Sequence, residues 1–173
     1  SNGGRRDHKR SMYEGGLNVP AMVKWKGHIP AGVKSYAPWV VSDIGLTILK
    51  ISGASQQLLN EYAGNNADKQ GTSKALDQLW TKGDQFLPER DYLITENCEG
   101  GESSCTFAVL DVRNWQTALP KLVFNGPKTG LQLFELVKDP KETEDLAQLP
   151  AYQSVVNSMH LVWRNNRIPR ATA

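Results

Sequence analysis

The sequence predicts a mixed fold, α/β in its first part and α+β as a whole. The end of a larger α/β layer is followed by a small four-stranded antiparallel sheet packed with a C-terminal helix. Four short runs, at residues 92–95, 106–112, 121–124 and 131–136, are rich in β-branched, aromatic and Leu residues, and turn-forming residues separate them. Residues 150–165 then carry an apolar stripe at helical spacing. The stripe consists of Tyr152, Val155, Val156, Met159, Val162 and Trp163.

A short apolar run at residues 19–25 predicts a buried strand in the first half of the chain. Pro20 has no N–H to donate to a sheet, so it belongs at the entrance of this strand. Two short amphipathic pieces follow later, at residues 56–62 and 74–80. The run at residues 19–25 and the helix described next predict the α/β layer.

Residues 42–52 have the signals of a helix. Ser42 can cap the N-terminus, and Gly53 lies just past the end, where a left-handed residue commonly closes a helix. Apolar residues recur at spacings of four and three, which predicts one buried face. That face consists of Ile44, Ile48 and Ile51.

A change in character near residue 84 predicts three parts of the chain. Residues 1–53 are expected to end a larger α/β domain. Residues 54–83 connect it to the next part, and residues 84–173 are expected to form the antiparallel-sheet subdomain. No internal repeat or low-complexity tract interrupts this order.

Composition excludes several classes of protein. The 173 residues are 39% hydrophobic and 22% charged, as in folded globular proteins and unlike disordered ones. No apolar run approaches the roughly 20 residues of a membrane-spanning helix. The formal net charge of +2, from 20 basic and 18 acidic side chains, is too small to predict a nucleic-acid or membrane partner.

The residues with the clearest chemistry lie close to the N-terminus. Lys9 lies on a loop that Gly15 and Gly16 close, and a lysine there can meet an anion as a point charge with up to three hydrogen bonds. Glu14, directly before the glycines, can fix the loop by accepting backbone N–H bonds or by pairing with a cation. The pattern indicates a loop that can present Lys9 to an anion.

This stretch resembles the sulfatase family, whose members carry Gly-Lys-x-x-x-x-Glu-Gly-Gly-x-x-Val-Pro, then a strand and Trp-x-Gly. The chain has the same residues in order from Lys9 to Gly27, with His8 in the place of the first Gly. Residues 43–49 resemble the family's Asp-x-x-Pro-Thr-Leu-Leu helix. Residues 133–147 are close to its Leu-Tyr-Asp-Leu-x-x-Asp-Pro-x-Glu-x-x-Asn-Leu-Ala. We therefore identify the chain as similar to the C-terminal portion of a sulfatase (arylsulfatase).

The resemblance implies an alkaline-phosphatase-like scaffold and hydrolysis of aryl or carbohydrate sulfate esters. In the family the nucleophile is a formylglycine, made from a Cys or Ser in Cys/Ser-x-Pro-Ser-Arg, and calcium lies on Asp and Asn side chains. Lys9 corresponds to a lysine that binds the sulfate group, and His8 is a second candidate for substrate contact. Glu14, Gly15 and Gly16 correspond to the structural motif that aims this lysine.

Neither the formylglycine motif nor the metal-ligand pairs of the family occur in this sequence. We therefore expect a C-terminal portion, with nucleophile and calcium in a missing N-terminal part of the same protein. This portion is expected to hold no metal ligand and to have no sulfatase activity alone. The family implies a periplasmic or secreted protein, or a lysosomal one in a eukaryote.

Two other functions fit the same residues. A phosphonate or phosphodiester hydrolase of the same superfamily shares much of the scaffold. A noncatalytic module would bind anionic glycans through the basic residues near the N-terminus, although a solvated loop is the simpler interpretation of its arginines. These basic residues are Arg5, Arg6, Lys9 and Arg10.

The two cysteines leave their pairing open. Cys98 and Cys105, seven residues apart, suit a local disulfide if the protein is exported and two free thiols if it is not. The remaining histidines indicate no catalysis, since His28 lies in a turn and His160 lies beside the apolar stripe of the last helix. No two histidines have the spacing of metal ligands.

Overall fold

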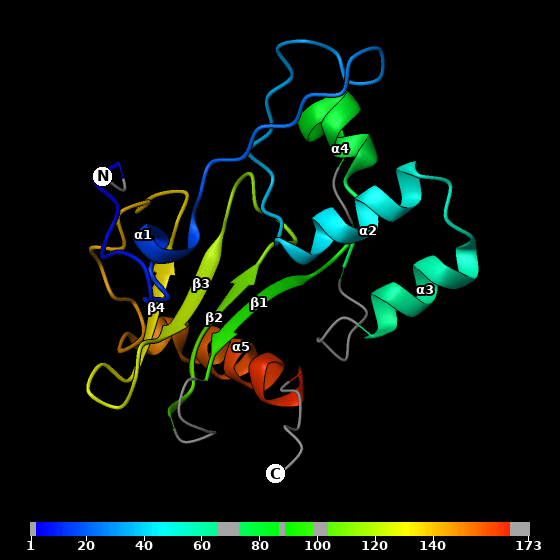
Figure 1. Ribbon diagram of the computed structural model, residues 1–173. Coiled ribbons are helices and arrows are strands. Elements are labelled where there is room, and N and C mark those ends of the chain that lie inside the picture. Colours follow the sequence, from blue (N-terminus) through cyan, green and yellow to red (C-terminus); the bar gives the residue numbers. More distant parts are fainter. Residues whose placement is uncertain (1–2, 66–72, 87–88, 99–103, 167–173) are drawn as a thin grey trace. The chain divides into compact units, whose positions relative to one another are not determined.

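The computed structural model describes residues 3–65, 73–86, 89–98 and 104–166 (Figure 1). The chain forms two compact units. The first, here called the sheet unit, comprises Ser1–Pro20 and Asp91–Asn165, and the second, the helical unit, comprises Ala21–Arg90 and Asn166–Ala173. The N-terminal stretch thus lies in one unit with the sheet. The division into parts at residues 53 and 84 stays a prediction.

The sheet unit is built on a four-stranded antiparallel sheet in the order β1-β2-β3-β4. Its antiparallel pairing and its place in the second half of the chain confirm the predicted fold. In the register, Lys121 of β3 lies between Leu110 of β2 and Phe134 of β4. The strands are β1 Tyr92–Asn97, β2 Thr106–Asp111, β3 Pro120–Phe124 and β4 Leu131–Glu135.

The helix α5, Gln153–Asn166, covers one face of this sheet, as predicted (Figure 1). Successive side chains of a strand point to opposite faces, so Phe107 and Val109 share a face of β2. They form one apolar core with Val156 and Met159 of α5. The short 3-10 turn η3, Pro150–Tyr152, precedes the helix.

The N-terminal segment covers the opposite face of the sheet. Met12 and Tyr13 are buried there with Ala108, Val123 and Phe134. A single helical turn, α1 Glu14–Leu17, follows them. Because Lys121 alternates with Leu122 along β3, its side chain lies on this N-terminal side of the sheet.

The helical unit contains α2 Ser42–Ile51, α3 Gln56–Asn65, α4 Asp77–Lys82 and the 3-10 turn η1 Gly83–Gln85. The predicted buried strand at residues 19–25 is wrong. These residues form no helix or strand, no described segment pairs with them, and Val19 and Met22 are 73% and 100% exposed. A strand needs partners for its backbone N–H and C=O groups, and an apolar pattern alone does not supply them.

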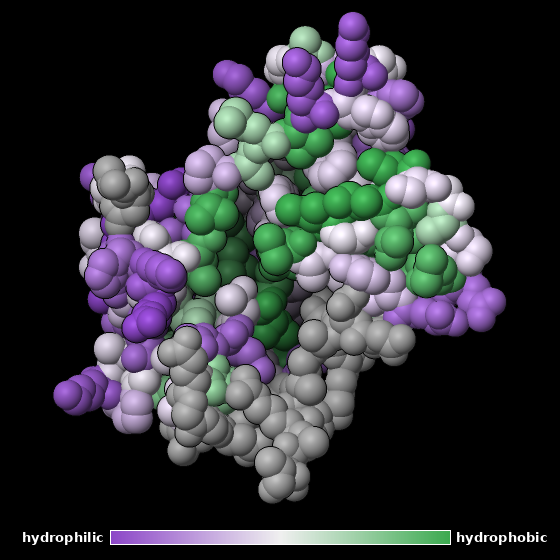
Figure 2. Space-filling model, viewed as in Figure 1, coloured by the Kyte–Doolittle hydropathy of each residue, from purple (hydrophilic) through white to green (hydrophobic). Residues whose placement is uncertain are grey.

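The buried face of α2 also differs from the prediction. Asp43, Leu46 and Thr47 are buried, whereas Ile48 is 51% exposed. Figure 2 shows hydrophobic side chains at the surface over α2. Two polar groups decide which face turns inward, because each accepts a backbone hydrogen bond. Asp43 Oδ1 accepts from Lys74 N–H at 2.8 Å, and Thr47 Oγ1 accepts from Leu76 N–H at 2.8 Å.

The start of α2 is capped in a different way from the one predicted. Ser42 is the first helical residue, not the cap, and the capping position is held by Val41. Asp43 Oδ2 accepts a hydrogen bond from the N–H of Val40 at 3.0 Å, and this bond ties the entering chain to the first turn. Gly53 takes φ 79 just past the helix, as its position predicted.

A disulfide joins Cys98 to Cys105 at the neighbouring ends of β1 and β2. Both cysteines are buried. The sequence left open a disulfide or two free thiols, and the structure has the disulfide. None of the described helices combines the length and the apolar character needed to cross a membrane.

Candidate anion-binding site

Lys9 lies in a tight turn formed by residues 8–11. The N–H of Ser11 donates to the carbonyl of His8 at 3.1 Å and closes the turn. Arg10 takes φ 79 and Asp7, just before the turn, takes φ 59, a backbone region that non-Gly residues seldom occupy. Lys9 is exposed. The turn thus presents the Lys9 side chain outward, in a conformation that its surroundings must hold.

Gly16 lies directly against this turn. A Cβ atom at position 16 would lie 2.3 Å from the carbonyl oxygen of Ser11 and 2.8 Å from that of His8. Only glycine permits such a close approach of two backbone segments. The second glycine of the Glu14-Gly15-Gly16 motif therefore lets α1 support the turn that carries Lys9.

The chain is anchored to the sheet directly after the turn. The N–H of Met12 donates to Asn125 Oδ1 at 2.9 Å, at the end of β3. The hydroxyl of Tyr13 donates to Gln132 of β4, and its ring lies edge-on to that of Phe134, with 6.0 Å between centroids. These contacts fix the downstream end of the turn to two strands.

Glu14 is buried and takes part in an ion cluster, which we name after its members Glu14, Lys121 and Glu142. Lys121 Nζ lies 2.8 Å from Glu14 Oε1 and 2.9 Å from Glu142 Oε1. The N–H of Glu14 donates to Glu142 Oε2 at 2.6 Å, and Asn18 Nδ2 donates to Glu14 Oε2 at 2.7 Å. Lys121 and Glu142 are fully buried. One ammonium thus joins two carboxylates from distant parts of the chain.

Burial raises the pKa of the Glu142 carboxyl above its usual range. The Lys121 ammonium and the N–H of Glu14 act in the opposite direction, because they stabilise the charged form. Glu142 also takes φ 55. Removing Lys121 would leave this carboxylate buried without its cation.

Arg6 connects this cluster to the turn. Its Nη1 donates to the main-chain carbonyl of Glu142 at 2.7 Å, and its own carbonyl accepts from Gly15 N–H at 2.9 Å. Its guanidinium lies 3.9 Å from the centre of the Tyr13 ring. The interpretation of Arg6 as a solvated loop residue is wrong, because three separate contacts hold it.

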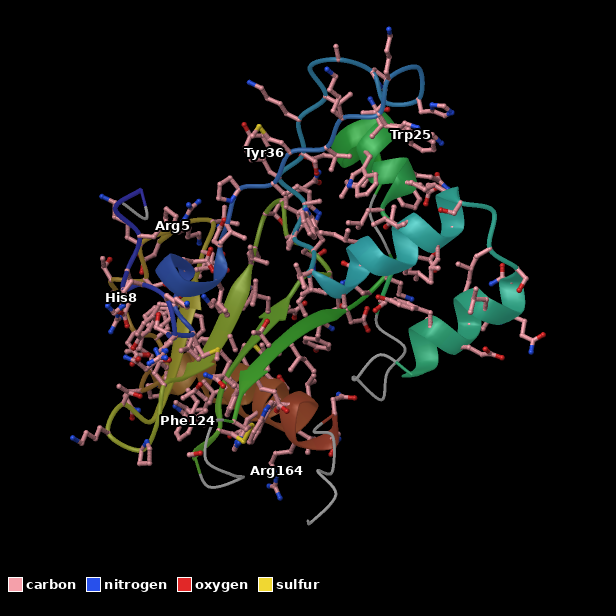
Figure 3. All side chains as sticks on the ribbon, viewed as in Figure 1. Arg5, His8, Trp25, Tyr36, Phe124 and Arg164 are labelled. Atoms are coloured by element: carbon pink, nitrogen blue, oxygen red, sulfur yellow. A yellow bond between two sulfur atoms is a disulfide. The ribbon has the colours of Figure 1, made fainter. Side chains whose placement is uncertain are left out.

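The other predicted residues lie on the outside of the same loop. Figure 3 shows Arg5 and His8 on the N-terminal loop beside α1. His8 is exposed, and its Nδ1 lies 2.7 Å from Asp7 Oδ1. Arg10 is exposed as well. The structure brings His8, Lys9 and Glu14 into one local assembly, and their roles toward a substrate stay predictions.

Lys121 and Glu142 are the residues of this assembly that sequence reasoning missed. Lys121 has a recognisable signal, since it interrupts an otherwise apolar strand, and a buried lysine requires a partner. Glu142 has none, because it follows Asp139 and Pro140 in what reads as a turn and helix cap. Asp139 does cap that turn, accepting from Thr143 N–H at 2.7 Å and from Glu144 N–H at 2.9 Å.

No group of three or more His, Cys, Asp or Glu side chains among the described residues is arranged to hold a metal ion. The ion cluster does not fit a cation either, since the Lys121 ammonium already lies between its carboxylates. The cation that this site presents is the Lys9 ammonium, on a turn that Arg6, Met12 and Gly16 hold in place.

Part of this chain is similar in sequence to known sulfatases. Mouse arylsulfatase G is 34% identical over 61 residues, 35% of this chain and 12% of that protein. Dog arylsulfatase G is 36% identical over 61 residues, covering 35% and 11%. Pig N-acetylgalactosamine-6-sulfatase is 42% identical over 45 residues, covering 26% and 9%. The resemblance to the sulfatase family that the motifs predicted is confirmed, and the match spans about a tenth of each relative's length.

Two solved structures are also similar to part of this chain. A protein of Bacteroides thetaiotaomicron assigned as a sulfatase gives a TM-score of 0.43 at 16% identity, covering 69% of this chain and 22% of its own. A 2-O GAG sulfatase gives 0.42 at 16% identity with the same coverage. No family model matches the chain.

Proposed function

We propose that this chain is the C-terminal portion of a sulfuric ester hydrolase and that Lys9 binds the sulfate group of its substrate. One observation carries the proposal: Lys9 is exposed on a turn held by Arg6 before it, by Met12 after it and by Gly16 against it. Such a turn holds a cation at a defined place, which suits recognition of an anion. The sequence similarity to arylsulfatases supports sulfate as that anion.

The chemistry of Lys9 follows from its charge. An ammonium group can donate three hydrogen bonds to sulfate oxygens and offset their charge. If the group lies where charge grows as the ester bond breaks, it also stabilises the transition state. Neither a formylglycine motif nor a described metal cluster belongs to this chain, so we assign the nucleophile and calcium to another part of the protein.

The substrate class and the location belong to the same proposal. The substrate is a sulfate ester of an aryl or carbohydrate group, as expected from the resemblance. The Cys98–Cys105 disulfide supports a periplasmic, secreted or lysosomal protein, because structural disulfides persist in oxidising compartments. The part of the protein that holds the nucleophile is the expected partner of this chain.

The test is steady-state kinetics of the full-length gene product on a chromogenic aryl sulfate and on the matching aryl phosphate. Lys9→Ala is expected to lower kcat/KM for the sulfate ester by about 100-fold, as for loss of one charge-stabilising donor. Lys128→Ala is the matched control, since Lys128 is an exposed lysine in the β3–β4 connection. Equal kinetics of the two variants would refute the role of Lys9, and a preference for the phosphate ester would refute the substrate class.

A further inference from the structure

The ion cluster has two arms that leave Lys121 in different directions. One arm runs through the Glu14 carboxylate to the start of α1, and the other runs through the Glu142 carboxylate to the segment after β4. The N–H of Glu14 also donates to Glu142 Oε2, so the two arms are joined to each other. A displacement of Lys121 would therefore affect both segments.

Both arms end on the same residue, Arg6. From the Glu142 arm, the main-chain carbonyl of Glu142 accepts from Arg6 Nη1 at 2.7 Å. From the Glu14 arm, the N–H of the next residue, Gly15, donates to the Arg6 carbonyl at 2.9 Å. Arg6 thus has its side chain fixed by one arm and its backbone fixed by the other, only two positions before the turn that carries Lys9.

We propose that Lys121 and Arg6 are positioning residues for Lys9. The buried Glu14–Lys121–Glu142 cluster holds Arg6, and Arg6 holds the turn of residues 8–11 in the orientation that presents the Lys9 ammonium to an anion. The expected effect on kcat/KM rests on the proposed function. The expected effect on the orientation of the turn does not. The cluster thus links the two family-like motifs, because Glu14 lies in the first and Glu142 lies in the second.

The turn itself supplies the reason why it needs such support. Asp7 and Arg10 have positive φ without being glycine, and such residues persist only where their surroundings over-determine them. Downstream, Met12 N–H bonded to Asn125 supplies one restraint. Upstream, Arg6 supplies a further restraint through its bonds with Glu142 and Gly15 and its contact with the Tyr13 ring. Without the Arg6 side chain, the turn would lose its link to the Glu142 carbonyl and its contact with the Tyr13 ring.

The geometric part is tested with a nitroxide label. Lys9→Cys in the full-length protein gives one labelling site in this chain, because Cys98 and Cys105 are bridged. We expect the electron paramagnetic resonance spectrum at position 9 to show a more mobile label when Arg6→Ala or Lys121→Met is added. Arg113→Ala is the matched control, since Arg113 also lies over a tyrosine ring, at 5.2 Å from that of Tyr92, and pairs with Asp111.

The catalytic part is tested by a double-mutant cycle in the same protein. Arg6→Ala is expected to lower kcat/KM for an aryl sulfate about tenfold when Lys9 is present and to have no further effect in the Lys9→Ala background. If Lys121→Met fails to fold, Arg6→Ala alone tests the positioning of Lys9. This variant removes a half-buried side chain and leaves the ion cluster intact.

The outcomes separate the two proposals. An unchanged label mobility in Arg6→Ala would overturn the positioning role, as would an equal loss of kcat/KM with and without Lys9. Increased mobility at position 9, with kinetics that do not respond to Lys9→Ala, would support the positioning role while refuting sulfate binding by Lys9. Increased mobility together with non-additive kinetics supports both.

Discussion

Arg6 donates a hydrogen bond from Nη1 to the main-chain carbonyl of Glu142 at 2.7 Å, although 136 positions separate the two residues in the chain. The bond joins the loop that carries Lys9 to the segment after β4. The motif of Glu14, Gly15 and Gly16 and the motif that contains Glu142 are therefore one structural assembly. Four expected outcomes test this assembly and the fold around it.

Gly16→Ala is expected to destabilise the sheet unit and to displace the Lys9 turn, because the added Cβ would lie 2.3 Å from the Ser11 carbonyl oxygen. We expect a loss of at least about 2 kcal/mol in the free energy of unfolding, measured with denaturant. Gly130→Ala is the control, since Gly130 has φ 64 but no atom within 4 Å of an added Cβ. Its cost should be about 1 kcal/mol, from backbone strain alone. Equal costs would show that close approach to the turn is unimportant.

Lys121→Met is expected to cost about 3–5 kcal/mol, because it leaves the Glu14 and Glu142 carboxylates buried without their cation. Adding Glu14→Gln and Glu142→Gln to this variant removes both charges and should recover part of the loss. Denaturant unfolding of the single and triple variants measures this. A single variant as stable as the wild type would contradict the assignment of Lys121 as the centre of the cluster.

Much of the sheet unit could be predicted from the sequence. Alternation and turn residues indicate the four strands, and the stripe that contains Val156 and Met159 indicates α5, because these patterns are local. The support of Lys9 could not be predicted in this way. Arg6 bonds with Glu142, and Asn125 with Met12, across more than 100 positions of the chain. Each of Arg6, Asn125 and Glu142 has a solvated loop or turn as its local interpretation.

In the helical unit, the local pattern predicted the helix α2 but not the face that it buries. The isoleucines of residues 42–52 have helical spacing, and the helix forms, but Asp43 and Thr47 determine its buried face. Arg90 Nη2 lies 2.8 Å from Asp43 Oδ1, and both side chains are buried. A buried ion pair must keep its partner, and this requirement outweighs the burial of one Ile side chain. Residues 19–25 likewise have an apolar pattern without a described partner.

Acidification is expected to weaken the contact between α5 and the sheet through His160. Burial, and next the nearby Arg164, lower the pKa of His160 below its usual 6.5, and its ring stacks with those of Phe107 and Trp163. The unfolded chain therefore binds the proton at a higher pH than the folded chain does. The free energy of unfolding should fall as pH drops below about 6.5, until the folded-state pKa is reached. A pH series of denaturant melts measures this.

The control for this prediction is His160→Phe, which keeps an aromatic ring at the position and removes the titration. Its free energy of unfolding should depend less steeply on pH just below about 6.5 than that of the wild type. Parallel curves for the two proteins would show that His160 has no part in the pH dependence.

Removing the Cys98–Cys105 disulfide is expected to lower the free energy of unfolding by about 2 kcal/mol, because the bridge closes only a short loop of the unfolded chain. The double variant Cys98→Ala/Cys105→Ala provides the comparison. Its loss should match that of the wild type under reducing conditions, and the variant itself should not respond to reductant. A wild type that is insensitive to reductant would contradict the presence of the disulfide.

Under the proposed function, this chain supplies the sulfate-binding lysine of an enzyme whose nucleophile lies elsewhere in the same protein. The most direct test is peptide mapping by mass spectrometry of the full-length gene product, aimed at any sequence preceding Ser1. We predict a peptide with a Cys/Ser-x-Pro-Ser-Arg motif whose Cys or Ser has been converted to formylglycine. A native protein without such a peptide would contradict the claim and would favour a noncatalytic module that binds anions through Lys9.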